Sequence, residues 1–105
     1  MDKYKIRIYP SAKTDLNEII SYLNTLSPQA ALRYYDLIVE KISSLDQLPE
    51  RCPFVRDVAL KAKGYRYLIV ENYLVFFVVK ADTVQIRRII YSRRNYDWLL
   101  HGGHA

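Results

Sequence analysis

The sequence predicts a small α+β protein in which a pair of helices packs on one face of a sheet. Two observations predict this class. Apolar residues recur at helical spacing across residues 11–48, and runs rich in Val, Ile, Tyr and Phe fill residues 65–91. The expected order is strand, helix, helix and three further strands. With 105 residues, we expect one domain over residues 1–105, in which 101–105 form a flexible tail.

The first half of the chain is predicted to form one strand and two helices. The stretch KYKIRIYP alternates between apolar and polar residues, which is typical of a half-buried strand, and Pro10 ends it. A first helix is expected to follow Ser11 as its cap residue. Ser27 and Pro28 predict a second start, with Ser27 as N-cap and proline at the first helical position. The second helix is expected to run to about residue 48, before Pro49.

The second half is predicted to form three consecutive strands after a loop. Residues 49–64 contain two prolines and mixed polarity, which favours a loop with a short extended piece at 54–60. The runs YRYLIV and YLVFFVVK flank Glu71 and Asn72, and Asn72 is expected to take the left-handed turn conformation. The second run has no alternation, which indicates a central strand covered on both faces.

The last predicted strand is TVQIRRIIY. Strict alternation along it places Val84, Ile86 and Ile90 on one face and Ile89 and Tyr91 on the other.

Several kinds of chemistry fit this chain poorly. Its two histidines, His101 and His104, lie in the glycine-bearing tail, and Cys52 is its single cysteine, so neither a metal site nor a histidine-based nucleophilic site is expected. The glycines form no phosphate-binding loop. We therefore expect no metal and no cofactor. The single cysteine and the early charged residues favour a cytoplasmic protein without a signal peptide, and no apolar stretch is long enough to span a membrane.

Positive charge is concentrated in the second half. The net charge is +5; residues 1–55 sum to zero, and residues 56–105 hold nine Lys/Arg against four Asp/Glu. This asymmetry indicates a polyanion or an acidic protein partner. One candidate site gathers the basic residues of neighbouring strands with a C-terminal tyrosine. Its members are Lys61, Lys63, Arg66, Arg87, Arg88, Arg93, Arg94 and Tyr96.

These residue types suit phosphate chemistry. Arginine matches phosphate oxygens bidentately, and a tyrosine surrounded by arginines has a lowered pKa, so it can act as a base without histidine. RNA cleavage through the 2′-hydroxyl needs orientation, proton transfer and charge stabilisation, which such a cluster could supply. The alternative is that the arginines lie at a sheet edge and discourage aggregation.

The segments YPSAKTDLNEIISYL, KGYRYLIVENYLVFFVV and VQIRRIIYSRRNYDWL resemble the RelE/ParE superfamily of toxins from bacterial type II toxin–antitoxin pairs. The resemblance covers nearly the whole chain. It implies a small, twisted, mostly antiparallel sheet with a helical hairpin. It also implies an acidic antitoxin partner that folds on binding, and operator DNA reached only through that antitoxin.

The resemblance assigns roles by position. In the RelE branch, which cleaves mRNA on the ribosome, the motif GYR places the catalytic arginine at Arg66. The strand-end arginine falls at Arg93 or Arg94, and the C-terminal tyrosine at Tyr96. Lys61, Lys63, Arg87 and Arg88 are then expected to bind RNA, and Trp98 and Leu99 to contact the antitoxin.

Three hypotheses follow from the two branches. The first is a translation-blocking, ribosome-dependent mRNA endoribonuclease, favoured by GYR, the arginine run and Tyr96. The second is a ParE-type toxin that poisons DNA gyrase by protein contact without catalysis, favoured by the long helix pair and the segment DLNEIISYL. The third is an attenuated member that serves antitoxin pairing and promoter autoregulation.

Overall fold

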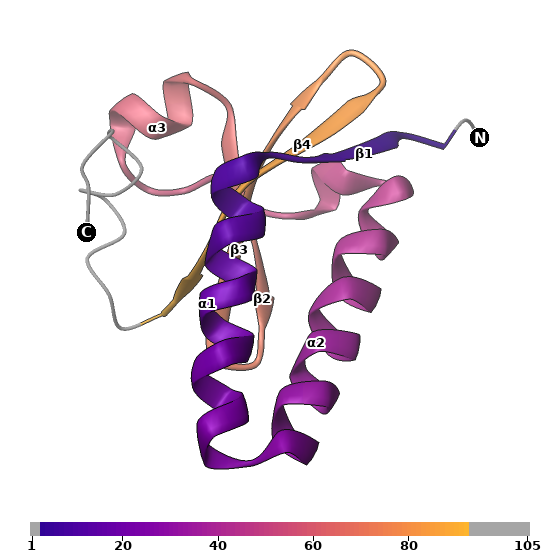
Figure 1. The fold of residues 1–105 in the computed structure, drawn as a ribbon. Coiled ribbons are helices and arrows are strands. Elements are labelled where there is room, and N and C mark those ends of the chain that lie inside the picture. Colours follow the sequence, from indigo (N-terminus) through magenta and orange to yellow (C-terminus); the bar gives the residue numbers. More distant parts are fainter. Residues whose placement is uncertain (1–2, 93–105) are drawn as a thin grey trace.

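The structure is a computed structural model, and it describes residues 3–92 of the chain. A four-stranded mixed sheet has the order β1-β4-β3-β2, which confirms the predicted α+β class. β1 (Lys5–Ile8) pairs in parallel with β4 (Thr83–Tyr91). β2 (Tyr65–Val70), β3 (Tyr73–Lys80) and β4 form an antiparallel meander. Figure 1 shows the hairpin of α1 (Pro10–Leu26) and α2 (Pro28–Ser43) beside this sheet.

The two helices begin at prolines. Pro28 occupies the first turn of α2, and the side chain of Ser27 accepts a hydrogen bond from the backbone N–H of Ala30 at 3.2 Å, as predicted. The prediction of Ser11 as cap of α1 is wrong. Pro10 begins this helix and Tyr9 is its N-cap, because proline needs no N–H partner in the first turn and its fixed φ suits the helix.

The loop between α2 and β2 is more structured than the sequence predicted. It contains two 3₁₀ turns (Ser44–Asp46 and Pro49–Arg51) and a short helix, α3 (Val58–Ala62). The side chain of Asp57 caps α3 by accepting from the N–H of Leu60 at 2.9 Å. The expected extended piece at 54–60 is reduced to one bridge, between Phe54 and Arg66.

The turn between β2 and β3 corrects another prediction. The left-handed residue is Glu71, with φ 55°, and not Asn72. Because Val70 still pairs with Tyr73 in the ladder, the turn has only two residues, and its first residue needs a positive φ.

A β-bulge changes the faces of β4. Phe76 of β3 pairs with Arg88, and the next residue, Phe77, pairs with Ile86, so Arg87 is the extra residue. The predicted strict alternation is therefore wrong beyond Ile86. Ile89 shares a core with Ile86, and Ile90 faces the opposite side.

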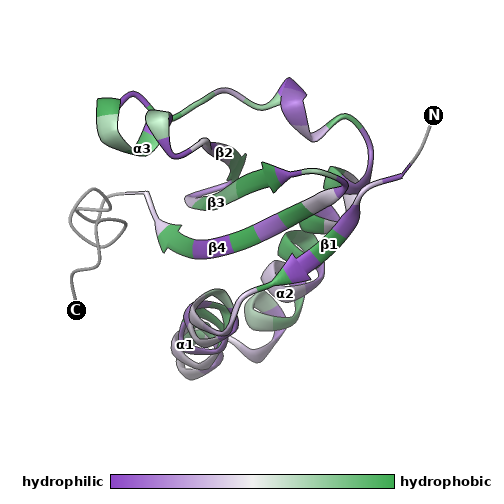
Figure 2. Cartoon of the chain, turned by 90° about the horizontal axis from the view of Figure 1, so that it is seen from above, coloured by the Kyte–Doolittle hydropathy of each residue, from purple (hydrophilic) through white to green (hydrophobic). Residues whose placement is uncertain are grey.

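The sheet separates two cores. Between the sheet and the α1–α2 hairpin, twelve of the described residues form one buried cluster, including Ile38, Phe77 and Ile86. On the opposite face, a smaller cluster of six described residues includes Leu60 of α3, Tyr65 and Phe76. Figure 2 shows the hairpin on one side of the sheet and the loop with α3 on the other. β3 is thus a central strand covered on both faces, as predicted.

Within residues 3–92, no helix combines the length and the apolar character that crossing a membrane requires.

Candidate functional site

The guanidinium group of Arg66 is held inside the loop that precedes α3. It donates hydrogen bonds to the carbonyl oxygens of Cys52 at 2.7 Å and of Glu50 at 3.1 Å. Its Cζ lies 3.8 Å from the ring centroid of Phe54, and Nη2 lies 4.0 Å from a carboxylate oxygen of Glu50. The side chain is 14% exposed. These contacts fasten the loop to β2, and the backbone of the two segments pairs at the same place.

Cys52 belongs to this same region. Burial raises the pKa of its thiol, although the positive charges of Arg51 and Arg66 act in the opposite direction. Cys52 is therefore a core residue in the protonated form, and its environment does not favour a reactive thiolate.

Arg88 forms a two-pronged ion pair with Asp15 of α1. Its Nε and Nη2 lie 2.7 and 2.9 Å from the two carboxylate oxygens. Asp15 also accepts a hydrogen bond from the backbone N–H of Ile89 at 2.9 Å. At this position β4 extends beyond the end of β1, so its edge is free of a strand partner among the described residues. The hydrogen bond with Asp15 raises the pKa of Arg88 above its ordinary value, against the effect of burial. Arg88 therefore joins α1 to the edge of the sheet.

Arg87 lies in a different environment. Its Cζ is 4.7 Å from the ring centroid of Tyr9 and 5.7 Å from that of Tyr65. Arg7 lies over the same Tyr9 ring at 5.0 Å. We call Arg7, Tyr9, Tyr65 and Arg87 the arginine–tyrosine surface.

The structure brings some of the predicted residues together and separates others. Lys61 and Arg66 share the ring of Phe54, from which the Nζ of Lys61 lies 5.9 Å. Lys63 is exposed at the end of α3. Arg66 and Arg87 lie on opposite faces of the sheet, since Arg66 contacts the side of the larger core through Cys52 and Arg87 contacts Tyr65 of the smaller one. The predictions for Arg93, Arg94, Tyr96, Trp98, Leu99 and the tail 101–105 lie outside the described residues.

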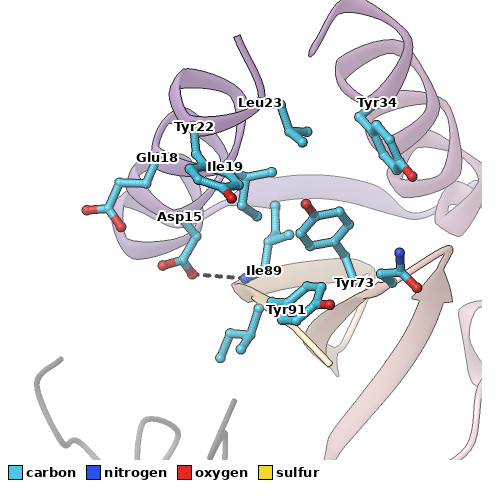
Figure 3. A pocket seen from close by; sticks show the side chains of 11 residues that line it. Asp15, Glu18, Ile19, Tyr22, Leu23, Tyr34, Tyr73, Ile89 and Tyr91 are labelled. Atoms are coloured by element: carbon cyan, nitrogen blue, oxygen red, sulfur yellow. Dashed lines mark hydrogen bonds between the residues drawn. The ribbon is translucent and has the colours of Figure 1, made fainter. Parts of the chain in front are cut away.

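A groove of about 580 Å³ lies between the helical hairpin and the ends of β3 and β4 (Figure 3). Tyr73 is at its centre, and its ring makes edge contacts with Tyr34 and Tyr91, each at 5.8 Å between centroids. Burial raises the pKa of Tyr73, and the neighbouring tyrosines act in the same direction, so its hydroxyl stays protonated at neutral pH. The exposed ring of Tyr22 and the carboxylates of Asp15 and Glu18 complete the rim.

This groove was not predicted from the sequence. Its tyrosines come from α1, α2, β3 and β4, so they are far apart in the sequence. The available signal was the high tyrosine count, ten in 105 residues, with several of them on helix and strand surfaces.

Comparisons with known proteins agree on the kind of protein this chain resembles. The family described as "ParE toxin of type II toxin-antitoxin system, parDE" matches residues 6–96. A search of curated sequences finds no match. Among solved structures, the chromosomal ParDE toxin–antitoxin system of P. aeruginosa is similar, with a TM-score of 0.73, 27% identity and coverage of 85% of this chain and 96% of that one. The toxin–antitoxin complex RelBE2 of Mycobacterium tuberculosis shares the fold, with a TM-score of 0.61, 20% identity and coverage of 85% and 98%.

Proposed function

This chain belongs to the ParE toxin family of type II toxin–antitoxin systems, and we propose that it inhibits DNA gyrase by protein contact, without catalysis. The family match and the likeness to a ParDE system support this branch over the endoribonuclease branch.

The observation that carries the choice is the placement of Arg66. An arginine that stabilises a phosphate in a transition state needs its N–H groups directed at the substrate. The guanidinium of Arg66 is instead 14% exposed and bonded to two loop carbonyls. Binding a phosphate would leave both carbonyls without this donor, at a cost of about 1–3 kcal/mol for each one that stays buried. Arg88 is similarly engaged, with Asp15.

A ribosome-dependent mRNA endoribonuclease is the second candidate. The proximity of Lys61 and Arg66 around Phe54 favours it, because a second cation then lies near the arginine of the motif GYR that the RelE branch uses. In this candidate the loop at residues 50–54 must release Arg66 when the substrate binds.

The two candidates differ in what the toxin stops first. After induced expression in bacteria, we expect loss of DNA supercoiling and a DNA-damage response before any fall in protein synthesis. Purified toxin should inhibit supercoiling by purified gyrase and should leave ribosome-bound mRNA intact. Early arrest of translation with cleaved mRNA would contradict the gyrase proposal and favour the second candidate.

A matched pair of variants tests the role of Arg66 in the same assays. Arg51, like Arg66, donates to loop carbonyls, those of Gln47 and Leu48. If Arg66 is structural, Arg66→Lys and Arg51→Lys should both keep their inhibition of gyrase in proportion to their folded fraction. If Arg66→Lys is folded but loses toxicity, and Arg51→Lys keeps it, Arg66 takes part in the toxic mechanism.

We also propose that the partner is an antitoxin that places an apolar helix face in the tyrosine-lined groove. The exposed rings of Tyr22 and Tyr91 offer large contact area there. The similar solved structures are themselves toxin–antitoxin complexes.

Tyr22 provides the test of this interface. Tyr22→Ala should weaken antitoxin binding about ten-fold or more, as expected for an aromatic anchor of an interface. Tyr35→Ala, on an exposed ring that does not line the groove, is the control. Equal affinity of the parent and Tyr22→Ala would place the antitoxin elsewhere.

A further inference from the structure

We propose that the arginine–tyrosine surface binds the phosphate backbone of double-stranded DNA. This differs from the expectation that DNA is reached only through the antitoxin. The surface lies on the face of the sheet that α1 and α2 leave uncovered, and none of its four residues lines the tyrosine-lined groove.

The sheet register places these residues side by side. Arg7 of β1 pairs with Gln85 of β4, Gln85 pairs with Val78 of β3, and Val78 pairs with Tyr65 of β2. Residues that pair in this way project on the same face, and Val78 and Tyr65 belong to the core opposite the helical hairpin. Arg87 directly follows Ile86, which faces the helical hairpin, so it projects on this same face, between the rings of Tyr9 and Tyr65.

Five cations of the described chain have an acidic partner, and the two arginines of this surface are not among them. Lys3, Lys5, Arg33, Arg66 and Arg88 each form an ion pair. Within residues 3–92, neither Arg7 nor Arg87 makes an ion pair or a hydrogen bond through its side chain. Both guanidinium groups lie over Tyr9, so two uncompensated charges are held close together.

The hydrogen bonding of this surface is also incomplete. The Nε of Arg87 and the Oε1 of Gln85 are buried without a hydrogen-bond partner among the described residues. Arg87 is half-buried as a whole, and its terminal nitrogens are not among these buried unpaired atoms. Stacking on a tyrosine ring fixes the plane of a guanidinium group and leaves its N–H edge available for phosphate oxygens.

The ring contacts favour a duplex over a single strand. Proteins bind unpaired bases by stacking them on free aromatic rings. Here Tyr9 already carries two guanidinium groups, and Tyr65 is only 8% exposed. The surface therefore offers charge without a stacking platform, which suits a regular phosphate backbone and not a splayed strand. Arg56, Lys61 and Lys63 add exposed positive charge from the loop and α3 that cover the same face.

The test measures binding of the full-length toxin to a labelled duplex of about 20 base pairs at a series of salt concentrations. The slope of log affinity against log salt falls by about 0.9 for each phosphate contact that is lost. We therefore expect Arg7→Gln/Arg87→Gln to reduce the slope by about two and to weaken binding roughly ten-fold or more at ~0.1 M salt. The single variant Arg7→Gln, at an exposed position, should reduce the slope by about one without affecting folding.

The control removes the same charge from the helical side. Arg33→Gln/Lys41→Gln, both on α2, should leave the slope unchanged. Equal losses in the two double variants would overturn the proposal, because they would show attraction by net charge alone. Tighter binding of single-stranded RNA than of the duplex would also overturn it. Displacement of the duplex by polyglutamate at equal charge would overturn it too, because that result indicates an acidic protein partner. Gyrase is absent from this assay, so its result is independent of the supercoiling result.

Discussion

The two faces of the sheet use the same residue types for different purposes. On the face covered by α1 and α2 the core is large, and Asp15 of α1 binds Arg88 at the edge of β4. On the other face, Arg87 lies between tyrosine rings without an acidic partner, and the core is smaller. Two consecutive arginines therefore have different partners although both project from the face opposite the hairpin: Arg88, paired with Phe76 of the smaller core, is bound to Asp15, and Arg87, the extra residue of the bulge, is not. The comparison indicates that stability is concentrated on the helical side and that the opposite side keeps charge available for a partner.

The largest expected effect compares two neighbouring phenylalanines of β3. Phe77 faces the helical side with 0% exposure and Phe76 the opposite side with 1%. Replacing either by alanine should lower the free energy of unfolding by about 3–5 kcal/mol. We expect Phe77→Ala to lie at the upper end of that range, because the cavity it leaves is enclosed by two helices and the sheet.

Urea unfolding of both variants at neutral pH measures the difference. Phe76→Ala should lie at the lower end of the range, since the smaller cluster can relax toward the loop that covers it. An equal or larger loss for Phe76→Ala would show that the two faces contribute equally, and the comparison above would fail.

The fold could be predicted where local signals decide it. Ser27 and Pro28 mark a helix start through their own chemistry, and the uninterrupted apolar run of β3 can only be buried on both sides. The five residues of α3 were missed because so short a helix shows no periodicity and depends on the cap at Asp57 and on the burial of Leu60. The sequence contained one sign of the bulge. Ile89 and Ile90 are both apolar, and after the shift of register they face the two different cores.

The site was less predictable because its geometry depends on contacts between distant segments. The motif GYR gives Arg66 a position in β2, but the residues that bind its guanidinium group, Glu50 and Cys52, come from a loop whose path the sequence does not reveal. In the same way, no local pattern indicates that Asp15 of α1 selects Arg88 and not Arg87.

The last prediction concerns this selection by Asp15. The side chains of Asp15 and Arg88 are 11% and 21% exposed, so removal of the carboxylate leaves a largely buried charge and an unpaired N–H at Ile89. Asp15→Ala should therefore lower the free energy of unfolding by about 2–4 kcal/mol, slightly less than the loss for a fully buried pair. Arg87→Gln, which breaks no ion pair among the described residues but removes two ring contacts, should change it by no more than about 1 kcal/mol. Asp15→Asn, which still offers one acceptor oxygen, should fall between them. Thermal and urea unfolding of the three variants measure this order directly. A loss of stability for Arg87→Gln as large as that for Asp15→Ala would mean that the fold depends on Arg87 as much as on the pair of Asp15 and Arg88.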